Sequence, residues 1–455
     1  MFAFVVVALA LARAGGSLDD PDVWWHVRTG RLILHTHRIP HTDPFSFTAA
    51  HGHWVPTAWL SDVAFSLVSS AGGVEGLRVL RILLALLVIC AVWLGARSVA
   101  GTTSQAALAT GLVVLGVSPF LRERPQVISL LFVAWLAVAM QRVIHGEAPR
   151  LLLWAAVCWA WANVHGMWIL LPVGVLGAGL LAVLGDRSKG HVAARSATVA
   201  LVSWAVVLVT PVGPRLAWWP LVVHRTAAPI TEWRPTVLTD PTARGFLLLL
   251  LVVVVRWALS SERVELPRLL YVLAVSAFAL MAFRNVAPAA LLLLPEVARP
   301  LQGTLAVTGE SVVVRAPVRG LAALALGLVL AGAHLAASPA VSRDQPIALV
   351  DRLAARHDQL RMLNHYDVGG LVTGRASPPA RVAIDGRTDI WSADYVRRYV
   401  SALNSGSGWR ELVDELHPNA ALLPRQSEIT QGLMIERHWR ITDTDGAWVL
   451  LEPPR

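Results

Sequence analysis

The chain has 455 residues, of which 55% are hydrophobic and only 15% charged, whereas a soluble globular domain carries about 25% charged residues. This excludes a single water-soluble domain for most of the sequence. The net charge is +9, but the basic side chains gather in short segments between apolar runs, a pattern that indicates membrane topology and not nucleic-acid binding. Cys90 and Cys158 lie inside apolar runs, which disfavours a disulfide framework.

Apolar runs that could cross a membrane recur from the N-terminus to about residue 338. They predict a polytopic α-helical membrane protein with about ten or eleven spans. The candidate spans cover residues 2–14, 77–96, 105–119, 126–144, 151–163, 167–184, 196–211, 243–259, 268–283, 286–298 and 320–338. The first run is shorter than the roughly 20 residues that a span requires. A different helix count there would invert the predicted topology.

Basic residues of the membrane part fall into alternate loops. They are Arg97, Arg142, Arg150, Arg187, Lys189, Arg195, Arg256, Arg263, Arg268, Arg299, Arg315 and Arg319. By the positive-inside rule these loops face the cytoplasm. The remaining loops, including a long first one over residues 15–76, then face outward together with the C-terminal segment.

Unusual polar side chains concentrate in the predicted outer loops. They are Arg122, Glu123, Arg124, Asn163, His165, Glu232, Arg234, Arg284 and Asn285. Ionisable residues at the ends of several spans, converging on one face, indicate a functional site. Each one taken singly could instead be a snorkelling arginine or a helix cap.

The first outer loop opens with an acidic pair, Asp20 and Asp22, on either side of Pro21. Two carboxylates at this spacing could share a divalent cation such as Mg²⁺ or Mn²⁺, or one could act as a general base. The alternative is an N-cap cluster, because residues 22–34, which include His26, have helical periodicity. The loop contains His51 and other polar residues, and its length predicts a folded loop with short helices and not a flexible linker.

Residues 341–455 have an ordinary charge density and predict a small soluble α/β domain, so the membrane domain covers residues 1–340. We expect a helix over 347–363, a loop over 364–370, a strand over 381–384, a helix over 409–416, a strand over 420–423 and a closing hairpin over 439–442 and 448–451. Asp385, Arg387 and Asp389 follow the first strand, where α/β sheets place ligand groups. The alternative is a turn in which Asp and Arg form a local ion pair.

Several of these patterns resemble a group of bacterial membrane proteins described as membrane glycosyltransferases. The resemblance rests on Asp20-Pro21-Asp22-Val23-Trp24-Trp25-His26, Gly30, Ile39-Pro40, Asp43-Pro44-Phe45-Ser46, Trp54, Trp59-Leu60, the run from Trp161 to Gly166, and the run from Asp385 to Asp389. More distantly, the layout is similar to the GT-C superfamily of polyprenyl-phosphate-sugar-dependent glycosyltransferases. That resemblance implies Asp20 or Asp22 as general base or metal ligand. Those enzymes also carry an arginine cluster near the acid, which this sequence does not match residue by residue.

The resemblance and the sorted loops together predict a glycosyltransferase of the bacterial cytoplasmic membrane, with its C-terminal domain outside. It would transfer a sugar from a polyprenyl-phosphate-linked donor to a hydroxyl on a glycan, lipid or protein acceptor. The donor phosphate would meet Arg122, Arg124, Arg234 or Arg284. The rival interpretations are a transporter or flippase of lipid-linked sugars, which requires polar residues near the bilayer midplane, and a non-catalytic scaffold with an outer sensing domain.

Overall fold

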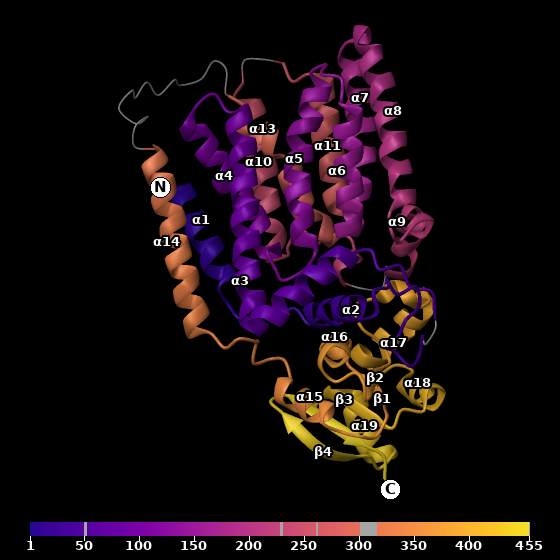
Figure 1. The fold of residues 1–455 in the computed structure, drawn as a ribbon. Helices are drawn as coiled ribbons and strands as arrows, with labels where there is room; N and C mark the ends of the chain where they lie inside the picture. The colour runs from indigo at the N-terminus through magenta and orange to yellow at the C-terminus, as the bar shows by residue number, and fades with distance from the viewer. Residues whose placement is uncertain (50–51, 228–230, 261–262, 301–315, 455) are drawn as a thin grey trace. The chain divides into compact units, whose positions relative to one another are not determined.

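The computed structural model describes residues 1–49, 52–227, 231–260, 263–300 and 316–454, so His51 and Arg315 lie outside the described residues. The fold is mostly helical, with one small sheet in the C-terminal part (Figure 1). Packing divides the chain into two compact units. The first comprises Met1–Gly16, Arg78–Ala217 and Thr231–Ser338, and the second comprises Ser17–Leu77, Trp218–Ile230 and Pro339–Arg455. The expected boundary at residue 340, between a membrane domain and a soluble domain, stays a prediction.

The first unit is a bundle of apolar helices. The helices that contribute to it are α1 (Phe2–Ala14), α3 (Trp59–Val99), α4 (Thr103–Val117), α5 (Gln126–Ile144), α6 (Leu151–Val164), α7 (Leu170–Gly185), α8 (Gly190–Ala205), α9 (Pro214–Ala227), α10 (Arg244–Ala258), α11 (Leu266–Met281), α12 (Val286–Leu292), α13 (Leu294–Ala298) and α14 (Ala316–Ala337). Within the described ranges, six helical segments are long and apolar enough to cross a membrane, and four shorter apolar helices accompany them. The predicted polytopic membrane fold is therefore confirmed.

Large apolar side chains remain exposed on the bundle, as on Leu94, Leu152, Leu180 and Leu251. A helix that is apolar on all sides requires either a protein core or lipid around it. Because these leucines face away from the protein, lipid is the solvent that suits them. Each predicted span coincides with helical segments to within a few residues, except that the helix expected from residue 77 begins at Trp59 and contains non-helical backbone at Gly73.

The short first helix is held in the bundle by close packing against small residues. Helix α1 packs on α14 and α4. A Cβ added to Gly327 would lie 3.1 Å from the Cα of Ala8, and one added to Gly111 would lie 2.7 Å from the Cα of Ala3. Small residues let membrane helices approach closely enough for dispersion contacts to hold them together. A helix of 13 residues is thereby held beside longer neighbours.

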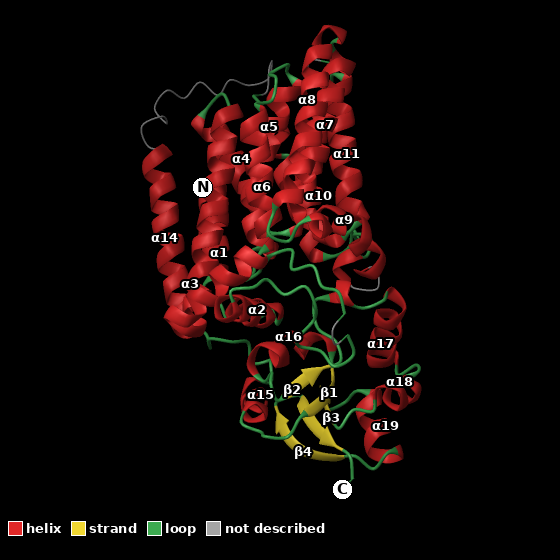
Figure 2. Ribbon diagram, turned by 45° about the vertical axis from the view of Figure 1, so that its right-hand side comes forward, coloured by secondary structure: helices red, strands yellow, loops and turns green. Residues whose placement is uncertain are grey.

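The second unit contains a five-stranded mixed sheet with helices around it (Figure 2). Its strands are β1 (Leu360–Asn364), β2 (Ala380–Val382), β3 (Ala420–Pro424), β4 (Arg440–Asp445) and β5 (Trp448–Glu452), in the order β2-β1-β3-β5-β4. Its helices include α2 (Asp22–Thr36), α15 (Ile347–Ala354), α16 (Tyr366–Arg375), α17 (Ala393–Ser405), α18 (Trp409–Leu416) and α19 (Glu428–Glu436). Strands β2, β1 and β3 are parallel, and β3, β5 and β4 are antiparallel. The predicted small α/β domain and its closing hairpin are confirmed.

Two predictions for this part of the chain are wrong. The helix expected over 347–363 ends at Ala354, and its second half is the inner strand β1. That strand is buried on both faces, so its apolar residues give no strand periodicity. The loop expected over 364–370 is instead the start of α16, which His365 caps by accepting the N–H of Asp367. Two glycines in this helix allow close approach of other backbone, because a Cβ on Gly369 would lie 2.1 Å from the Ile384 carbonyl oxygen and one on Gly370 would lie 2.4 Å from that of Pro21.

The first outer loop folds onto the C-terminal sheet within this unit. Ser46 forms a parallel bridge with Val382, and the N–H of Phe47 donates to the Val382 carbonyl at 3.1 Å, which extends the sheet beyond β2. Helix α16 packs on α2, where a Cβ on Gly374 would lie 2.4 Å from the Cβ of Trp24. The prediction of a folded loop is therefore confirmed.

Gly30 offers a test of the close packing of α2 on α3. An added Cβ at this position would lie 1.9 Å from the backbone oxygen of Asp62. We expect Gly30→Ala to cost about 1–3 kcal/mol, because overpacking must displace backbone. Gly72→Ala is the control, since nothing lies within 4 Å of its added Cβ. Thermal unfolding in detergent should show a lower midpoint for the first variant only, and equal midpoints would refute the contact.

Candidate functional site

Arg387 lies at the centre of a buried polar cluster in the second unit. Its guanidinium donates to Asp385 at 2.6 Å and to Asp43 at 2.7 Å, and all three side chains are at most 2% exposed. The rings of Phe45 and Trp54 lie 4.9 Å and 4.8 Å from its Cζ, within the range of cation–π attraction. Asp43, Phe45 and Trp54 of the first loop therefore surround one arginine of the C-terminal part.

The charges of this cluster support one another. Burial alone would lower the pKa of Arg387, but the carboxylates of Asp385 and Asp43 outweigh it and raise that pKa above its ordinary value. Burial would also raise the pKa of Asp43, yet the charge of Arg387 and hydrogen bonds from Ser46 and the Phe45 amide lower it. The local ion pair considered from the sequence is present. A contact of Asp385 or Arg387 with a substrate stays a prediction.

The acidic pair of the first loop lies beside the 385–389 turn. Asp20 is 1% exposed, and its Oδ1 accepts the backbone N–H of Asp22 at 3.0 Å, so the N-cap interpretation describes Asp20 in part. Asp22 is more exposed. Its carboxylate lies against Gly386, where an added Cβ would come within 2.1 Å of the Asp22 Oδ1. Only a glycine leaves room for that carboxylate beside the turn.

A divalent cation has few ligands here. Among the described residues, no group of three or more His, Cys, Asp or Glu side chains could hold a metal ion. Mg²⁺ can bind through one or two carboxylates when a substrate phosphate supplies further oxygens. A Mg²⁺ or Mn²⁺ ion held by Asp20 and Asp22 stays a prediction.

Asp389, on the same turn, has a carboxyl group whose pKa is raised toward neutral pH. Burial raises its pKa to about 6, although a hydrogen bond from Trp219 acts in the opposite direction. The Trp219 Nε1 lies 2.9 Å from its Oδ2. A carboxyl group that titrates near neutral pH can donate as well as accept a proton. Trp219 supplies an aromatic surface next to it.

His26 occupies an interior position. Its Nδ1 lies 2.5 Å from Asp62 Oδ1, and both residues are buried, at 6% and 1% exposure. Its ring centroid is 3.6 Å from that of Trp25. The His26–Asp62 pair joins α2 to the first part of α3, which gives His26 a structural role. Its contact with substrate stays a prediction.

A separate cluster of arginines lies in the first unit. The loop after α4, the 3₁₀ turn Thr231–Trp233 and the turn Phe283–Asn285 meet there. Arg124 donates to Glu232 at 2.6 Å, and Arg284 lies over the Trp233 ring at 4.4 Å. The N–H of Phe283 donates to the carbonyl of Arg234 at 2.9 Å. Three of the predicted polar loops therefore converge.

The electrostatics of this cluster favour an anion. Burial would raise the pKa of Glu232, but Arg124, Arg284 and Arg122 lower it, so this carboxylate is ionised. Burial lowers the pKa of Arg284, with Arg124 adding to the effect and Glu232 opposing it. Three guanidinium groups around one carboxylate leave two positive charges in excess. Such an excess suits the oxygens of a phosphate group.

Sequence reasoning missed two buried arginines in the same unit, Arg78 and Arg81. Arg78 donates to the carbonyls of Gly16 and Gly15 at 3.0 Å and 2.9 Å. Arg81 donates to the carbonyl of Ala14 at 2.8 Å and to Glu123 at 2.8 Å. Cations suit the carbonyl end of a helix, here that of α1. The signal was present as two arginines three residues apart at the start of an apolar run.

The remaining predicted residues have clear structural partners. Glu123 is 1% exposed and pairs with Arg81. Asn163 donates to the carbonyl of Trp159, one turn earlier in the same helix α6, at 2.7 Å. Asn285 donates to the carbonyl of Phe278, in the last part of α11, at 2.9 Å. The Nδ1 of His165 lies 3.0 Å from the Oγ of Ser129. Their direct contact with substrate stays a prediction.

The overall fold matches the folds of solved structures at low sequence identity. ArnT from Cupriavidus metallidurans, solved bound to undecaprenyl phosphate, aligns with a TM-score of 0.52 at 14% identity over 100% of this chain and 98% of that chain. The same protein in its apo state gives 0.50 at 15% identity over 99% and 98%. The Archaeoglobus fulgidus oligosaccharyltransferase tethered with an acceptor peptide gives 0.52 at 11% identity over 93% and 68%. No family model and no curated protein sequence matches the chain. These matches confirm the expected fold, a polytopic helical part with a small C-terminal α/β domain.

Replacing Arg387 tests the buried cluster. Arg387→Met leaves Asp43 and Asp385 as two buried carboxylates without their cation, which should cost about 3–5 kcal/mol of unfolding free energy. Arg397→Met is the control, because the Arg397 side chain is 69% exposed. Thermal unfolding should separate the two variants clearly. A midpoint for Arg387→Met equal to that of the control would show that the cluster does not hold the unit together.

Asp389 predicts a pH dependence of stability. Its folded pKa of about 6 lies above the unfolded value of about 4, so folding favours the protonated form. The resulting stabilisation is complete below about pH 4 and is lost as the pH rises through about 6. Asp389→Asn should remove this dependence, while Asp394→Asn, at a 70% exposed side chain, should retain it. Unfolding midpoints across that window decide the matter, and identical profiles would contradict the assignment.

Proposed function

We propose that this chain is a membrane glycosyltransferase of the GT-C type that transfers a sugar from a polyprenyl-phosphate-linked donor to an acceptor hydroxyl, a proposal that its similarity to the ArnT fold supports. The observation that carries the proposal is the cluster of Arg122, Arg124 and Arg284 around the single carboxylate Glu232. Fold alone does not define a function, so the site must supply the argument. This cluster offers a net positive, aromatic-backed surface at the ends of membrane helices.

The leaving group explains why such a surface is useful. A polyprenyl-phosphate donor releases an anionic lipid phosphate as its bond to the sugar breaks. Preorganised cations lower the free energy of a transition state where that charge develops. Arginine suits the task, because its planar fork can bind two phosphate oxygens at once. The ArnT neighbour, which was solved with undecaprenyl phosphate bound, supports this class of donor.

The acceptor requires a base, and Asp22 is the best candidate. Its side chain is partly exposed and lies against Gly386, whereas Asp20 is buried and accepts the Asp22 N–H. The acceptor oxygen attacks the anomeric carbon as the bond from that carbon to the phosphate oxygen breaks. The hydroxyl proton passes to the Asp22 carboxylate, and the lipid phosphate leaves as an anion. Asp20 then acts by fixing the start of α2.

Asp389 and Trp219 provide groups for holding a sugar. Trp219 presents an indole whose N–H is already held by Asp389 at 2.9 Å, and an indole face stacks on the apolar face of a sugar ring. The Asp389 carboxyl can bond to a sugar hydroxyl in either protonation state. We assign this pair to acceptor or donor sugar binding.

The proposed topology places these reactions outside the bacterial cytoplasmic membrane. The basic loops that carry Arg142, Lys189 and Arg195 lie together at one end of the first unit, where Lys189 donates to the Ile144 carbonyl and Arg195 to that of Pro149. The arginine cluster of the proposed phosphate site lies on the alternate loops. By the positive-inside rule the first set faces the cytoplasm.

Asp22→Asn tests the base. We expect kcat for sugar transfer to fall roughly 10²–10⁴-fold, as when a positioned general base is lost, with little change in unfolding midpoint. Asp19→Asn is the matched control, since Asp19 is a neighbouring but exposed carboxylate. Turnover would be measured in detergent with a polyprenyl-phosphate sugar. Full activity of Asp22→Asn would remove this residue from the mechanism.

Arg124→Gln tests the phosphate site. Loss of one charge-assisted hydrogen bond should weaken binding of the polyprenyl phosphate about tenfold or more. Arg142→Gln serves as the control, because Arg142 is exposed on the basic loops. Product inhibition by polyprenyl phosphate would report the affinity for each variant. The same inhibition constant in both variants would reject Arg124 as a phosphate ligand.

A further inference from the structure

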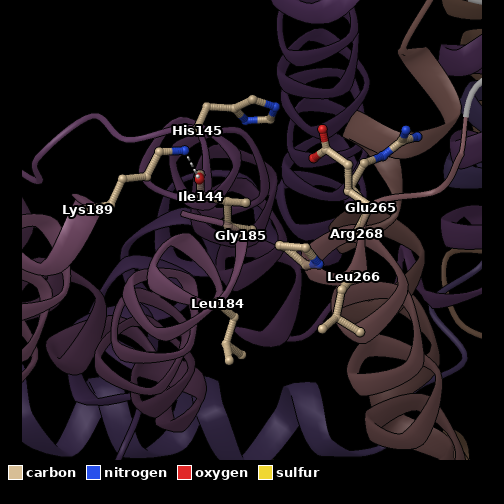
Figure 3. A pocket seen from close by; sticks show the side chains of 9 residues that line it. Ile144, His145, Leu184, Gly185, Lys189, Glu265, Leu266 and Arg268 are labelled. Atoms are coloured by element: carbon tan, nitrogen blue, oxygen red, sulfur yellow. Dashed lines mark hydrogen bonds between the residues drawn. The ribbon is translucent and has the colours of Figure 1, made fainter. Parts of the chain in front are cut away.

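The first unit contains a pocket that plays no part in the proposed reaction. It has a volume of about 430 Å³ and is lined by the ends of α5 and α7, the segment before α8 and the start of α11. Figure 3 shows Lys189 and His145 on one side of it and Glu265 with Arg268 on the other. Every lining residue belongs to the first unit, among the basic loops.

The charge around this pocket is positive. Four cationic side chains, Lys189, Arg268, Arg256 and Arg299, lie in or next to it. Three carboxylates oppose them: Glu265 in the lining, the buried Glu296, which Arg268 binds at 2.7 Å, and Asp186, which lies near Lys189. The four cations and three carboxylates leave one positive charge in excess. Within the described part of the chain, the Lys189 ammonium donates one long hydrogen bond of 3.4 Å, to the Ile144 carbonyl, so it retains donors for a ligand.

The pocket also opens along apolar surface. Leu184 and Leu266 both line it and are 57% and 54% exposed. Exposed leucines continue from each at helical spacing: Leu180 and Leu176 on α7, and Leu269 and Leu273 on α11. The two helices pack on each other. A cationic pocket at the end of two rows of exposed leucines suits a molecule with an anionic head and hydrocarbon tails.

We propose that this pocket binds the headgroup of an anionic glycerophospholipid, with its phosphate at Lys189 and Arg268 and its acyl chains along α7 and α11. Basic pockets between membrane helices on the cytoplasmic side bind such headgroups. A free phosphate ion shares the headgroup chemistry but gains nothing from the rows of leucines. The inference is independent of the sugar transfer proposed above, since it involves a different set of loops.

Lys189 makes the test direct, because it is the single lysine of the chain. The full chain would be placed in nanodiscs of phosphatidylcholine alone, or of phosphatidylcholine with phosphatidylglycerol of the same acyl chains. An amine-reactive acetylating reagent then labels Lys189, and mass spectrometry follows the rate. The Met1 amine in the same molecule is the internal reference for the surface potential. We expect phosphatidylglycerol to slow labelling of Lys189 about fivefold relative to Met1, as for one basic side chain engaged with an anionic headgroup.

Three outcomes are decisive. An unchanged ratio of Lys189 to Met1 labelling in phosphatidylglycerol overturns the proposal. Equal protection by inorganic phosphate in phosphatidylcholine nanodiscs also overturns it, because the site would then take a free ion. Protection by phosphatidylglycerol alone supports it.

A pair of variants gives an independent readout. Lys189→Glu should reduce phosphatidylglycerol retained on the purified protein, measured by native mass spectrometry, at least fivefold relative to Arg187→Glu. Arg187 is exposed on the same turn but does not line the pocket. Equal loss in the two variants would indicate general surface charge and would reject a specific pocket.

Discussion

The second unit depends on one buried cation. Arg387 comes from the turn after β2, whereas Asp43, Phe45 and Trp54 come from a loop more than 300 positions earlier in the chain. Desolvating a guanidinium group is costly unless carboxylates and hydrogen bonds replace its water. Here two carboxylates and two aromatic rings do so. Because breaking these contacts of Arg387 is costly, they hold the first loop against the C-terminal sheet.

That constraint has a consequence for chemistry. The loop that carries Asp22 is held by contacts on both sides, through the 46–48 segment on β2 and through α2 on the glycines of α16. A catalytic carboxylate must be held within a fraction of an ångström of its working position. The 385–389 turn therefore acts as a support for the acidic pair, and its own Asp389 adds a carboxyl group with a pKa near neutrality.

Each unit has its own set of charged groups. The first holds the arginines that suit a phosphate, and the second holds the carboxylates that suit a hydroxyl proton. The two polar ends of the first unit also differ: the Arg124 end is assigned to the donor phosphate, and the pocket at Lys189 is assigned to a structural lipid. Recognition of phosphate by cations is thus proposed at both places, for the sugar donor at Arg124 and for a phospholipid at Lys189.

The sequence by itself determined the membrane class, most helical segments of the apolar part and the closing hairpin, because apolar run length, periodicity and turn residues are local properties. Helices α9, α16, α17 and α19 were not expected from the sequence. The sequence did not determine the roles of Arg387 and Asp43, since their partnership spans most of the chain and leaves no local pattern. Strand β1 was mistaken for a helix because burial on both faces removes alternation. Arg78 and Arg81 were overlooked inside an apolar run. Only the tertiary structure decided which polar residues meet, because ion pairing depends on distance in space and not on position in the chain.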